Sequence, residues 1–271
     1  MTSTGRPARI AIVGAGWRAA LFAGIMKALP EEFDLVGVAA RRRESAERAA
    51  ASWGTAAFDD PVALATGARP ELTVVCVPWP DNPQVVSTLA AEGFRVLSET
   101  PPAPDLAGLH QLWDRIGGLG LVQVAEQYCE LPGHAARRAV VRGGAIGEVS
   151  GVEVSSTHGY HAVSLMRGFL GHVGAAPVTV QANRFTGVLA DPLSRAGWSD
   201  DLSPKPAETT VATVDFGTGY GLYDFTDNQW HNQLRFRRIL VRGSRGEIQD
   251  DRVVRCSWGL NPPVSRRLRA M

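Results

Sequence analysis

Residues 8–19 read Ala-Arg-Ile-Ala-Ile-Val-Gly-Ala-Gly-Trp-Arg-Ala, and this stretch decides the fold. The first six residues form a short, apolar and β-branched run that stops at Gly14, which predicts a buried parallel strand. A stretch rich in Ala, Leu, Phe and Met follows to about Leu29 and predicts a helix. Strand, glycine-rich turn and helix in this order are typical of a unit that binds a dinucleotide.

The alternation of strand and helix continues through the first half of the chain. Further strands are predicted at 34–39, 72–77, 94–98 and 121–125, with helices at 44–53, 84–92 and 105–116. Strands that alternate with helices lie parallel in one sheet, because each crossover helix returns the chain to the end of the sheet at which the previous strand began. We therefore expect an α/β Rossmann dinucleotide-binding domain over residues 1–125.

The pattern changes after Gly147. Short strands are predicted from Val149 and at 209–216, 220–225, 234–242 and 247–250, with one amphipathic helix at 161–170. Two glycine-containing turns, Gly-Thr-Gly and Gly-Ser-Arg-Gly, join pairs of these strands as hairpins. Residues 126–271 are expected to form an α+β domain with a mainly antiparallel open sheet, which binds substrate and dimerises. The stretch 189–207, rich in Pro, Asp and Ser, predicts a long loop.

The composition is that of an ordinary globular protein. Hydrophobic residues make up 45% and charged residues 20% of the 271 residues, which is enough for buried cores. A formal net charge of +1 creates no field to attract nucleic acid or membrane, and no apolar run is long enough to span a bilayer. The three cysteines are widely spaced without a CxxC pair, which argues against disulfides and zinc. We expect a cytoplasmic protein with a small-molecule substrate, no metal, and no nucleic-acid or membrane partner.

The glycine-rich turn carries the first candidate site residues. Gly14 permits a tight turn, and Gly16 lets the backbone approach a pyrophosphate at the helix N-terminus. Ala19 replaces the third glycine of the pattern and still allows close packing of helix on strand. The predicted cofactor-binding residues of this turn are Gly14, Gly16, Trp17 and Arg18.

The end of the second strand distinguishes between cofactors. NAD-binding proteins usually have an acidic residue there, which accepts a hydrogen bond from the ribose 2′-hydroxyl, whereas this chain has Ala40 followed by Arg41, Arg42 and Arg43. A guanidinium can hold a 2′-phosphate with two hydrogen bonds. We assign this role to Arg41 and Arg42 and expect Arg43 to be part of a solvated helix start, so the predicted cofactor is NADP(H).

Four segments in order resemble the Gfo/Idh/MocA oxidoreductases. They are the N-terminal fingerprint, Val96-Leu97-Ser98-Glu99-Thr100-Pro101 in place of the family's Glu-Lys-Pro, the run 143–149 as the junction between domains, and Gly159-Tyr160-His161 with the helix that follows. The resemblance implies a Rossmann domain and a sheet domain whose open face holds substrate over the nicotinamide. It also implies a catalytic Lys, and an Asp four residues before the His, but these positions are Thr100 and Thr157 here.

The chain also resembles the thiazolinyl imine reductases, which lack this lysine and use NADPH. In that branch an aromatic residue after the sixth strand is a proposed proton donor, and Glu126-Gln127-Tyr128 lies at that place. Reduction of a C=N bond needs hydride at carbon and a proton at nitrogen, which a phenol can supply if a neighbour stabilises the phenolate. The alternative for Tyr128 is a buried aromatic side chain at a strand end.

Several other positions have two interpretations. His161 is either an acid/base that faces the nicotinamide or a packing residue at a helix start, and Thr100 is a candidate hydrogen-bond donor in place of Lys. The resemblance of the segment 96–101 to the family's Glu-Lys-Pro places Glu99 with the cofactor site. Pro78 and Trp79 follow the strand 72–77 at the edge where doubly wound folds bind ligands, although Trp79 could equally pack on a neighbour.

The run 227–232, Asp-Asn-Gln-Trp-His-Asn, either contacts substrate or belongs to an interface between sheets, and we favour the interface. The expected assembly is a homodimer or homotetramer through the C-terminal sheet. The chain ends with Arg-Arg-Leu-Arg-Ala-Met where members of the resembled family usually continue, so a naturally short and a truncated chain are both open.

Three functions remain in competition. The leading one is an NADP(H)-dependent reductase of a C=N or C=O bond, with Tyr128 or His161 as proton donor. Because the Lys and Asp are absent, a catalytically silent NADP(H)-binding regulator is the second. A sugar or polyol dehydrogenase that uses His161 alone as base is the third.

Overall fold

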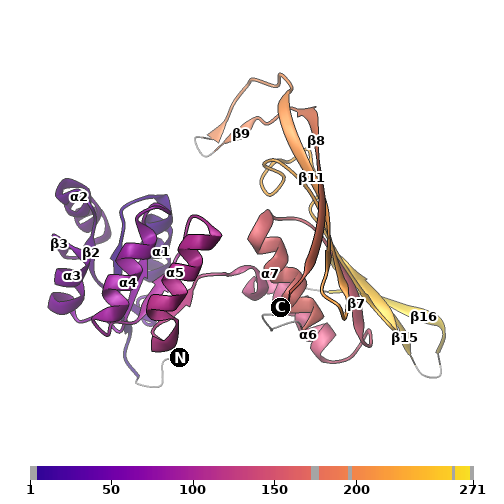
Figure 1. The fold of residues 1–271 in the computed structure, drawn as a ribbon, viewed down its shortest axis with the longest axis horizontal. Coiled ribbons are helices and arrows are strands. Elements are labelled where there is room, and N and C mark those ends of the chain that lie inside the picture. Colours follow the sequence, from indigo (N-terminus) through magenta and orange to yellow (C-terminus); the bar gives the residue numbers. More distant parts are fainter. Residues whose placement is uncertain (1–4, 172–176, 195–196, 258–259, 269–271) are drawn as a thin grey trace. The chain divides into compact units, whose positions relative to one another are not determined.

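The computed structural model describes residues 5–171, 177–194, 197–257 and 260–268. The chain divides into one unit that ends at Glu126 and a second that begins at Gln127 (Figure 1). Each unit has its own buried hydrophobic clusters. The first contains a parallel sheet and the second a mainly antiparallel one, which confirms the predicted fold class.

The first unit is a doubly wound sheet of six parallel strands in the order β3-β2-β1-β4-β5-β6. The strands are β1 (Ala8–Val13), β2 (Phe33–Ala39), β3 (Ala57–Phe58), β4 (Leu72–Val75), β5 (Val96–Ser98) and β6 (Val122–Val124). The helices are α1 (Trp17–Ala28), α2 (Arg43–Trp53), α3 (Pro61–Ala68), α4 (Asn82–Ala91) and α5 (Leu106–Ile116), with a 3₁₀ turn η1 (Gly117–Leu119).

Alternate residues of β1 face opposite sides of this sheet, and both sides are covered. Ile10 and Ile12 pack in one cluster with α1. Ala11 and Val13 pack in another with residues of α3, α4 and α5. Because β1 is buried on both sides it consists almost entirely of apolar residues, as expected for a central parallel strand.

The second unit begins with a short 3₁₀ turn and two helices on either side of a strand. These are η2 (Tyr128–Glu130), α6 (Pro132–Arg142), β7 (Val149–Ser155) and α7 (Gly159–Leu170). The strands that follow are β8 (Thr179–Leu189), β9 (Leu193–Ser194), β10 (Gly197–Trp198), β11 (Lys205–Asp215), β12 (Tyr220–Thr226), β13 (Arg238–Gly243), β14 (Gly246–Gln249), β15 (Arg252–Ser257) and β16 (Leu260–Arg267).

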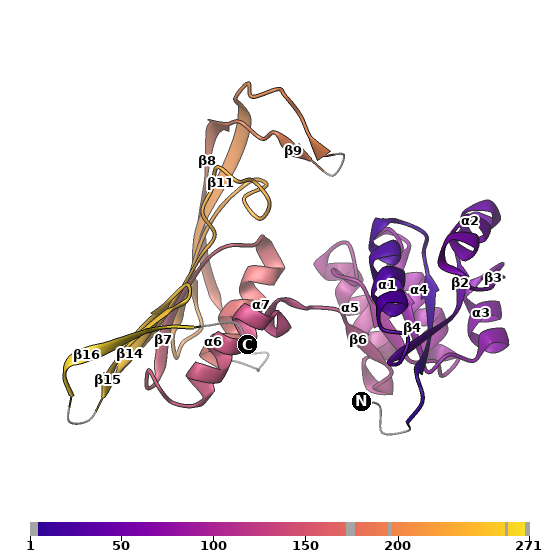
Figure 2. The same cartoon turned by 180° about the vertical axis from the view of Figure 1, so that it is seen from behind.

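Eight of these strands form one open sheet in the order β16-β15-β14-β13-β7-β12-β11-β8. Only the pair β7–β12 is parallel among its described pairings. The helices α6 and α7 lie against one face (Figure 1), where Val152 and Val154 of β7 pack with Leu165, Met166 and Phe169 of α7. The rear view shows β8 at one edge of the sheet and the β9–β10 segment projecting beyond it (Figure 2).

Three sequence-based expectations need correction. The stretch 189–207 is not one long loop, because β9 pairs with β10 and β11 begins at Lys205, where β8 is long enough to supply its partner Leu189. The predicted strand 234–242 begins only at Arg238, opposite Ser155 of β7. The elements β3, α3, α6, β8, β15 and β16 were not predicted, and the strands among them gain their hydrogen-bond partners only from the sheets.

In the part of the chain that the structure describes, no helix combines the length and the apolar character needed to cross a membrane.

Candidate active site

The glycine-rich turn has two glycines that are required for different reasons. Gly14 has φ +125°, and a Cβ built on it would lie 2.3 Å from the carbonyl oxygen of Cys76, so the closeness of β4 requires glycine here. Gly16 caps the N-terminus of α1 without a side-chain hydrogen bond, and a Cβ on it would meet no atom within 4 Å. The space beside Gly16 and the backbone N–H groups of α1 fit a pyrophosphate.

Arg18 and Glu99 form an ion pair between α1 and the end of β5. Arg18 Nε donates to Glu99 Oε1 at 2.6 Å, and the two side chains are only 17% and 16% exposed. The other carboxylate oxygen, Oε2, accepts from the backbone N–H of Thr100. Burial, reinforced by the charge of Glu99, raises the pKa of the neighbouring Cys76 thiol to about 12, so this thiol is neutral. Sequence reasoning placed Arg18 and Glu99 in the site separately and missed their pairing.

The arginines after β2 differ in their contacts. Arg43 donates to Glu47 and to Asp59, at 2.8 and 2.5 Å. Arg41 has a side chain 83% exposed, and its nearest recorded acid is Asp81 at 3.5 Å. Arg42 is also exposed and precedes α2 as its N-cap. A phosphate beside Ala40 could therefore be reached by Arg41 and Arg42, whereas Arg43 already has two carboxylate partners.

The segment after β4 is a turn that starts with exposed residues. The carbonyl of Pro78 accepts from the N–H groups of Asp81 and Asn82, and Trp79 is 54% exposed. Asn82 is buried, and its Nδ2 donates to Ser98 Oγ and to the carbonyl of Pro102, both at 2.8 Å. Asn82 thereby ties this turn to the segment that follows β5, and no sequence motif indicated this.

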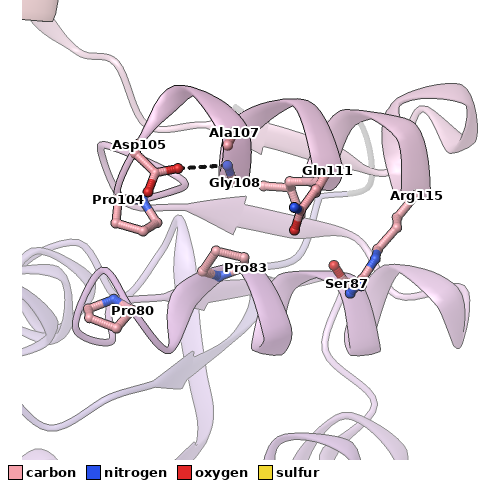
Figure 3. A pocket seen from close by; sticks show the side chains of 10 residues that line it. Pro80, Pro83, Ser87, Pro104, Asp105, Ala107, Gly108, Gln111 and Arg115 are labelled. Carbon is pink, nitrogen blue, oxygen red and sulfur yellow. Dashed lines mark hydrogen bonds between the residues drawn. The ribbon is translucent and has the colours of Figure 1, made fainter.

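A pocket of about 270 Å³ lies between α4 and α5 (Figure 3). Its lining is Pro80, Pro83, Ser87, Pro104, Asp105, Ala107, Gly108, Gln111, Leu112 and Arg115. None of the predicted cofactor-binding residues is in this lining, so the pocket has no part in the cofactor assignment.

In the second unit, the start of α7 carries His161, one of the two predicted proton donors. His158 is its N-cap, and the N–H of Gly159 donates to the hydroxyl of Tyr223 on β12 at 3.0 Å. Burial raises the pKa of Tyr223, so this phenol stays protonated as it anchors the helix start. One turn into α7, His161 is 8% exposed.

Tyr128 and His161 lie together. Their ring centroids are 4.4 Å apart, and those of His158 and His161 are 4.9 Å apart. The ring of Tyr160 is also close, with its centroid 4.3 Å from that of His161. The fold thus gathers phenol and imidazole groups from η2 and α7 at the start of that helix, and each of these side chains can give or take a proton.

The two threonines in the family's Lys and Asp positions differ in exposure. Thr157 is fully buried, and its Oγ1 has no hydrogen-bond partner among the described atoms. A hydroxyl carries no charge with which to orient or polarise His161, so the family's Asp–His pair has no equivalent at this position. Thr100 is half-buried, and its backbone N–H donates to the carboxylate of Glu99.

His134 of α6 also faces this group of rings and was missed by sequence reasoning. Its ring centroid lies 6.4 Å from that of Tyr128. Burial, and next the charge of Arg137, lower the pKa of His134 to about 4, so the ring is neutral near pH 7. Its position three residues after an exposed leucine gave no functional signal.

Part of the run 227–232 is an internal anchor. Gln229 is 3% exposed; its Nε2 donates to the carbonyl and hydroxyl of Ser155 and to the carbonyl of Phe236, and its Oε1 accepts from Thr226. Asn232, equally buried, donates to Ala190 and Asp191. These two side chains serve the fold, while the interface role predicted for the run remains a prediction.

Among the described residues, no group of three or more His, Cys, Asp or Glu side chains is placed to hold a metal ion.

Comparison with known proteins identifies the family of the first unit. Residues 8–126 match the sequence model of the Gfo/Idh/MocA group, an oxidoreductase family with an NAD-binding Rossmann fold. The first unit therefore belongs to this family, which confirms the resemblance carried by the two motifs of this unit. The likeness to the thiazolinyl imine reductases remains a prediction.

A curated relative supports the same family. The D-glucoside 3-dehydrogenase of Escherichia coli strain K12 is 29% identical over 120 residues. The match covers 44% of this chain and 34% of the relative, so it spans about a third of that protein's length.

Solved structures share the fold over nearly the whole chain. An NAD-binding oxidoreductase from Klebsiella pneumoniae aligns with a TM-score of 0.72 and 16% identity, over 97% of this chain and 80% of that chain. Levoglucosan dehydrogenase, solved with NADH and levoglucosan, has a TM-score of 0.73 at 15% identity, with the same coverage. At such identities the likeness shows the fold alone.

Proposed function

We propose that this protein is an NADP(H)-dependent oxidoreductase that reduces a C=N or C=O bond of a small molecule, with Tyr128 or His161 as proton donor. The contact of their rings at 4.4 Å carries the proposal, because it puts two proton-donating groups side by side. The uncharged hydroxyl of Thr157, at the position where the resembled family has an Asp, supports reduction over the family's sugar oxidation.

The proposed preference for NADP(H) rests on charge. The β2 end has Ala40 in place of an acid, and the exposed guanidinium groups of Arg41 and Arg42 follow it. A 2′-phosphate gains charge-assisted hydrogen bonds from such groups. Gly14, Gly16, Trp17, Arg18, Pro78, Trp79 and Glu99 complete the proposed cofactor site. When bound, the nicotinamide would supply the hydride, and the protein would bind, orient and protonate.

The first experiment is a fluorescence titration with NADPH and NADH. We expect NADPH to bind more tightly than NADH. Arg41→Ala should weaken NADPH binding about tenfold, a loss of about 1.4 kcal/mol in binding free energy, and should have little effect on NADH binding. Arg43→Ala is the matched control, because Arg43 is engaged by Glu47 and Asp59 and should leave both affinities unchanged. Equal affinities for the two nucleotides would contradict the preference, and binding of neither would contradict the function.

The second experiment is a turnover screen with cyclic imines and carbonyl compounds. Tyr128→Phe and His161→Phe should each be tested, and we expect the donor's variant to lose 10²–10⁴-fold in kcat. Turnover unchanged in both would exclude these residues as donors. Binding of NADPH without turnover of any compound would favour the silent regulator.

A second candidate function is sugar or polyol dehydrogenation. The curated relative is a D-glucoside 3-dehydrogenase and one structural neighbour is a levoglucosan dehydrogenase, which favour it. It predicts reduction of NADP or NAD by glycosides or polyols at high pH, with loss of activity in His161→Phe and not in Tyr128→Phe.

We also propose that the substrate-binding second unit forms a homodimer or homotetramer through its sheet. The edge strand β8 supports this, because ten of its eleven residues are exposed and, among the described residues, it pairs only with β11. An exposed strand edge of this length is a template for pairing with another chain.

A further inference from the structure

Three aromatic side chains from three elements lie near one another. His134 of α6 and Tyr128 of η2 have ring centroids 6.4 Å apart, and Tyr128 and His161 of α7 have centroids 4.4 Å apart. Tyr128 therefore has one histidine neighbour on α6 and another on α7. Only His161 has a place in the proposed function, which leaves His134 to be explained.

A neighbouring arginine fixes the tautomer of His134. Arg137 Nη1 lies 3.4 Å from His134 Nδ1, and because a guanidinium can only donate, Nδ1 is the acceptor. Arg137 is itself held, since its Nε donates to the carbonyl of Asp250 at 2.5 Å. In a neutral imidazole whose Nδ1 accepts, the hydrogen is on Nε2, so His134 has one N–H to donate.

Burial, and next the charge of Arg137, lower the pKa of His134 and keep its ring neutral near pH 7. Its own helix contributes the guanidinium of Arg137, which is balanced by Asp250 and Asp251 after β14. The next arginine of α6, Arg138, pairs with Glu130 of η2 at 2.8 Å. From α7 the titratable groups nearest this site are His161, which contacts Tyr128, and His158, which contacts His161. With no described carboxylate against its ring, His134 is a hydrogen-bond donor and not a source of protons near pH 7.

We propose that His134 is a positioning residue for Tyr128, whose phenolate it stabilises through its Nε2–H. The proposal rests on the proposed function. In the protonation step the O–H bond of Tyr128 breaks, an N–H or O–H bond forms on the reduced substrate, and the electron pair stays on the phenol oxygen. The phenolate then regains a proton from water. A ring spacing of 6.4 Å is one that a hydrogen bond of about 2.8 Å between N–H and phenol oxygen can span.

The direct test is the acidity of Tyr128, which needs neither cofactor nor substrate. The chain has four tyrosines, so the difference in tyrosinate absorbance between wild type and Tyr128→Phe isolates this phenol. The same difference is then measured in a His134→Phe background. We expect the acid dissociation constant of Tyr128 to fall about tenfold in the His134→Phe background, because the phenolate loses a hydrogen-bond donor. His134→Gln, whose amide still offers an N–H, should recover most of the difference.

Controls and kinetics separate positioning from damage to the fold. His110→Phe removes an exposed histidine of the first unit and should leave the titration unchanged. Near-UV circular dichroism shows whether His134→Phe has folded. If it has not, His134→Gln and Arg137→Gln carry the test. Arg137→Gln should shift the Tyr128 titration, because Nδ1 of His134 loses the donor that fixes its tautomer. With a substrate that turns over, kcat should fall about tenfold in His134→Phe while KM stays constant.

An unchanged Tyr128 titration in folded His134→Phe overturns this proposal and leaves the proposed function intact. A shifted titration with Tyr128→Phe fully active supports the contact and overturns the catalytic role of Tyr128 instead.

Discussion

At the residue scale, the glycine-rich turn separates folding from binding within three positions. Gly14 has a positive φ and the carbonyl of Cys76 where a side chain would be. Gly16 has φ −85°, which any residue can adopt, and open space beside it. The first glycine is demanded by the neighbouring strand and the second only by a ligand, if the proposed cofactor site is right.

We expect alanine to affect these two positions differently. Gly14→Ala should cost about 2–4 kcal/mol of the free energy of unfolding, because it adds strain at positive φ and a steric clash. Gly16→Ala should cost less than about 1 kcal/mol, since the Cβ meets nothing. Yet it should weaken NADPH at least tenfold. Urea unfolding and nucleotide titration measure the two effects; full NADPH affinity in Gly16→Ala would contradict the proposed site.

His134 makes the stability depend on pH. Its pKa is about 4 in the folded protein and 6.5 in the reference state, so the unfolded chain binds more protons between these values. The stabilisation that comes from the neutral His134 is therefore fully present above pH 6.5, and the free energy of unfolding decreases as the pH falls toward 4. After allowance for partial exposure we expect about 1–2 kcal/mol between pH 7 and 4.5. Urea unfolding of wild type and His134→Gln at both pH values measures this difference; parallel pH profiles would contradict it.

At the element scale, the buried side-chain amide of Gln229 ties the connection between β12 and β13 to the end of the neighbouring strand β7. Gln229 lies in the connection between β12 and β13, and its hydrogen bonds reach Ser155 at the end of β7 and Phe236 ahead of β13. These bonds hold the connection over the strand ends. Similarly, the Arg18–Glu99 pair joins α1 to the segment after β5 in the first unit.

Replacement of Gln229 by leucine should destabilise the second unit by about 2–4 kcal/mol, because several buried polar groups lose their partner at once. Leu234→Ala in the same connection, where the side chain is 58% exposed, should change stability by less than about 0.5 kcal/mol. Thermal or urea unfolding followed by far-UV circular dichroism compares them. A Gln229→Leu variant as stable as wild type would show that the connection holds without this anchor.

At the scale of the whole molecule, the two units have separate cores, and the sheet of the second keeps an open edge. Strand β8 exposes Phe185 and Val188 to 57% and 67%. Strand β8 contains no proline and a single charged residue, Arg184, so it lacks the residues that usually prevent an edge strand from pairing with another chain.

If the proposed assembly uses this sheet, Phe185→Lys should shift the protein toward monomer and raise the dimer dissociation constant at least tenfold, because it places a charge in an apolar contact. Leu106→Lys, which changes an exposed residue of the first unit, is the control and should leave the assembly unchanged. Sedimentation velocity over a range of concentrations measures both. A wild-type chain that sediments as a monomer throughout would contradict the proposed oligomer.

The sequence alone determined most of the first unit, since a parallel strand buried on both faces must be apolar and the turn from β1 into α1 requires glycine at Gly14. The run from Ala8 to Val13 with Gly14 behind it therefore predicted β1, its helix and the Rossmann fold. Hairpin turns likewise predicted the antiparallel pairs β11–β12 and β13–β14. These signals are local, because neighbouring residues in the chain produce them.

Only the tertiary structure decided which side chains meet. Gln229 belongs to a polar run that the sequence assigned to substrate contact or an interface, yet it is buried, because Ser155, 74 residues away in sequence, supplies two of its partners. His134 carried no motif, yet α6 places it beside Tyr128 and leaves its ring neutral. Burial and contact between distant elements set hydrogen bonding and pKa, and a linear pattern does not contain them.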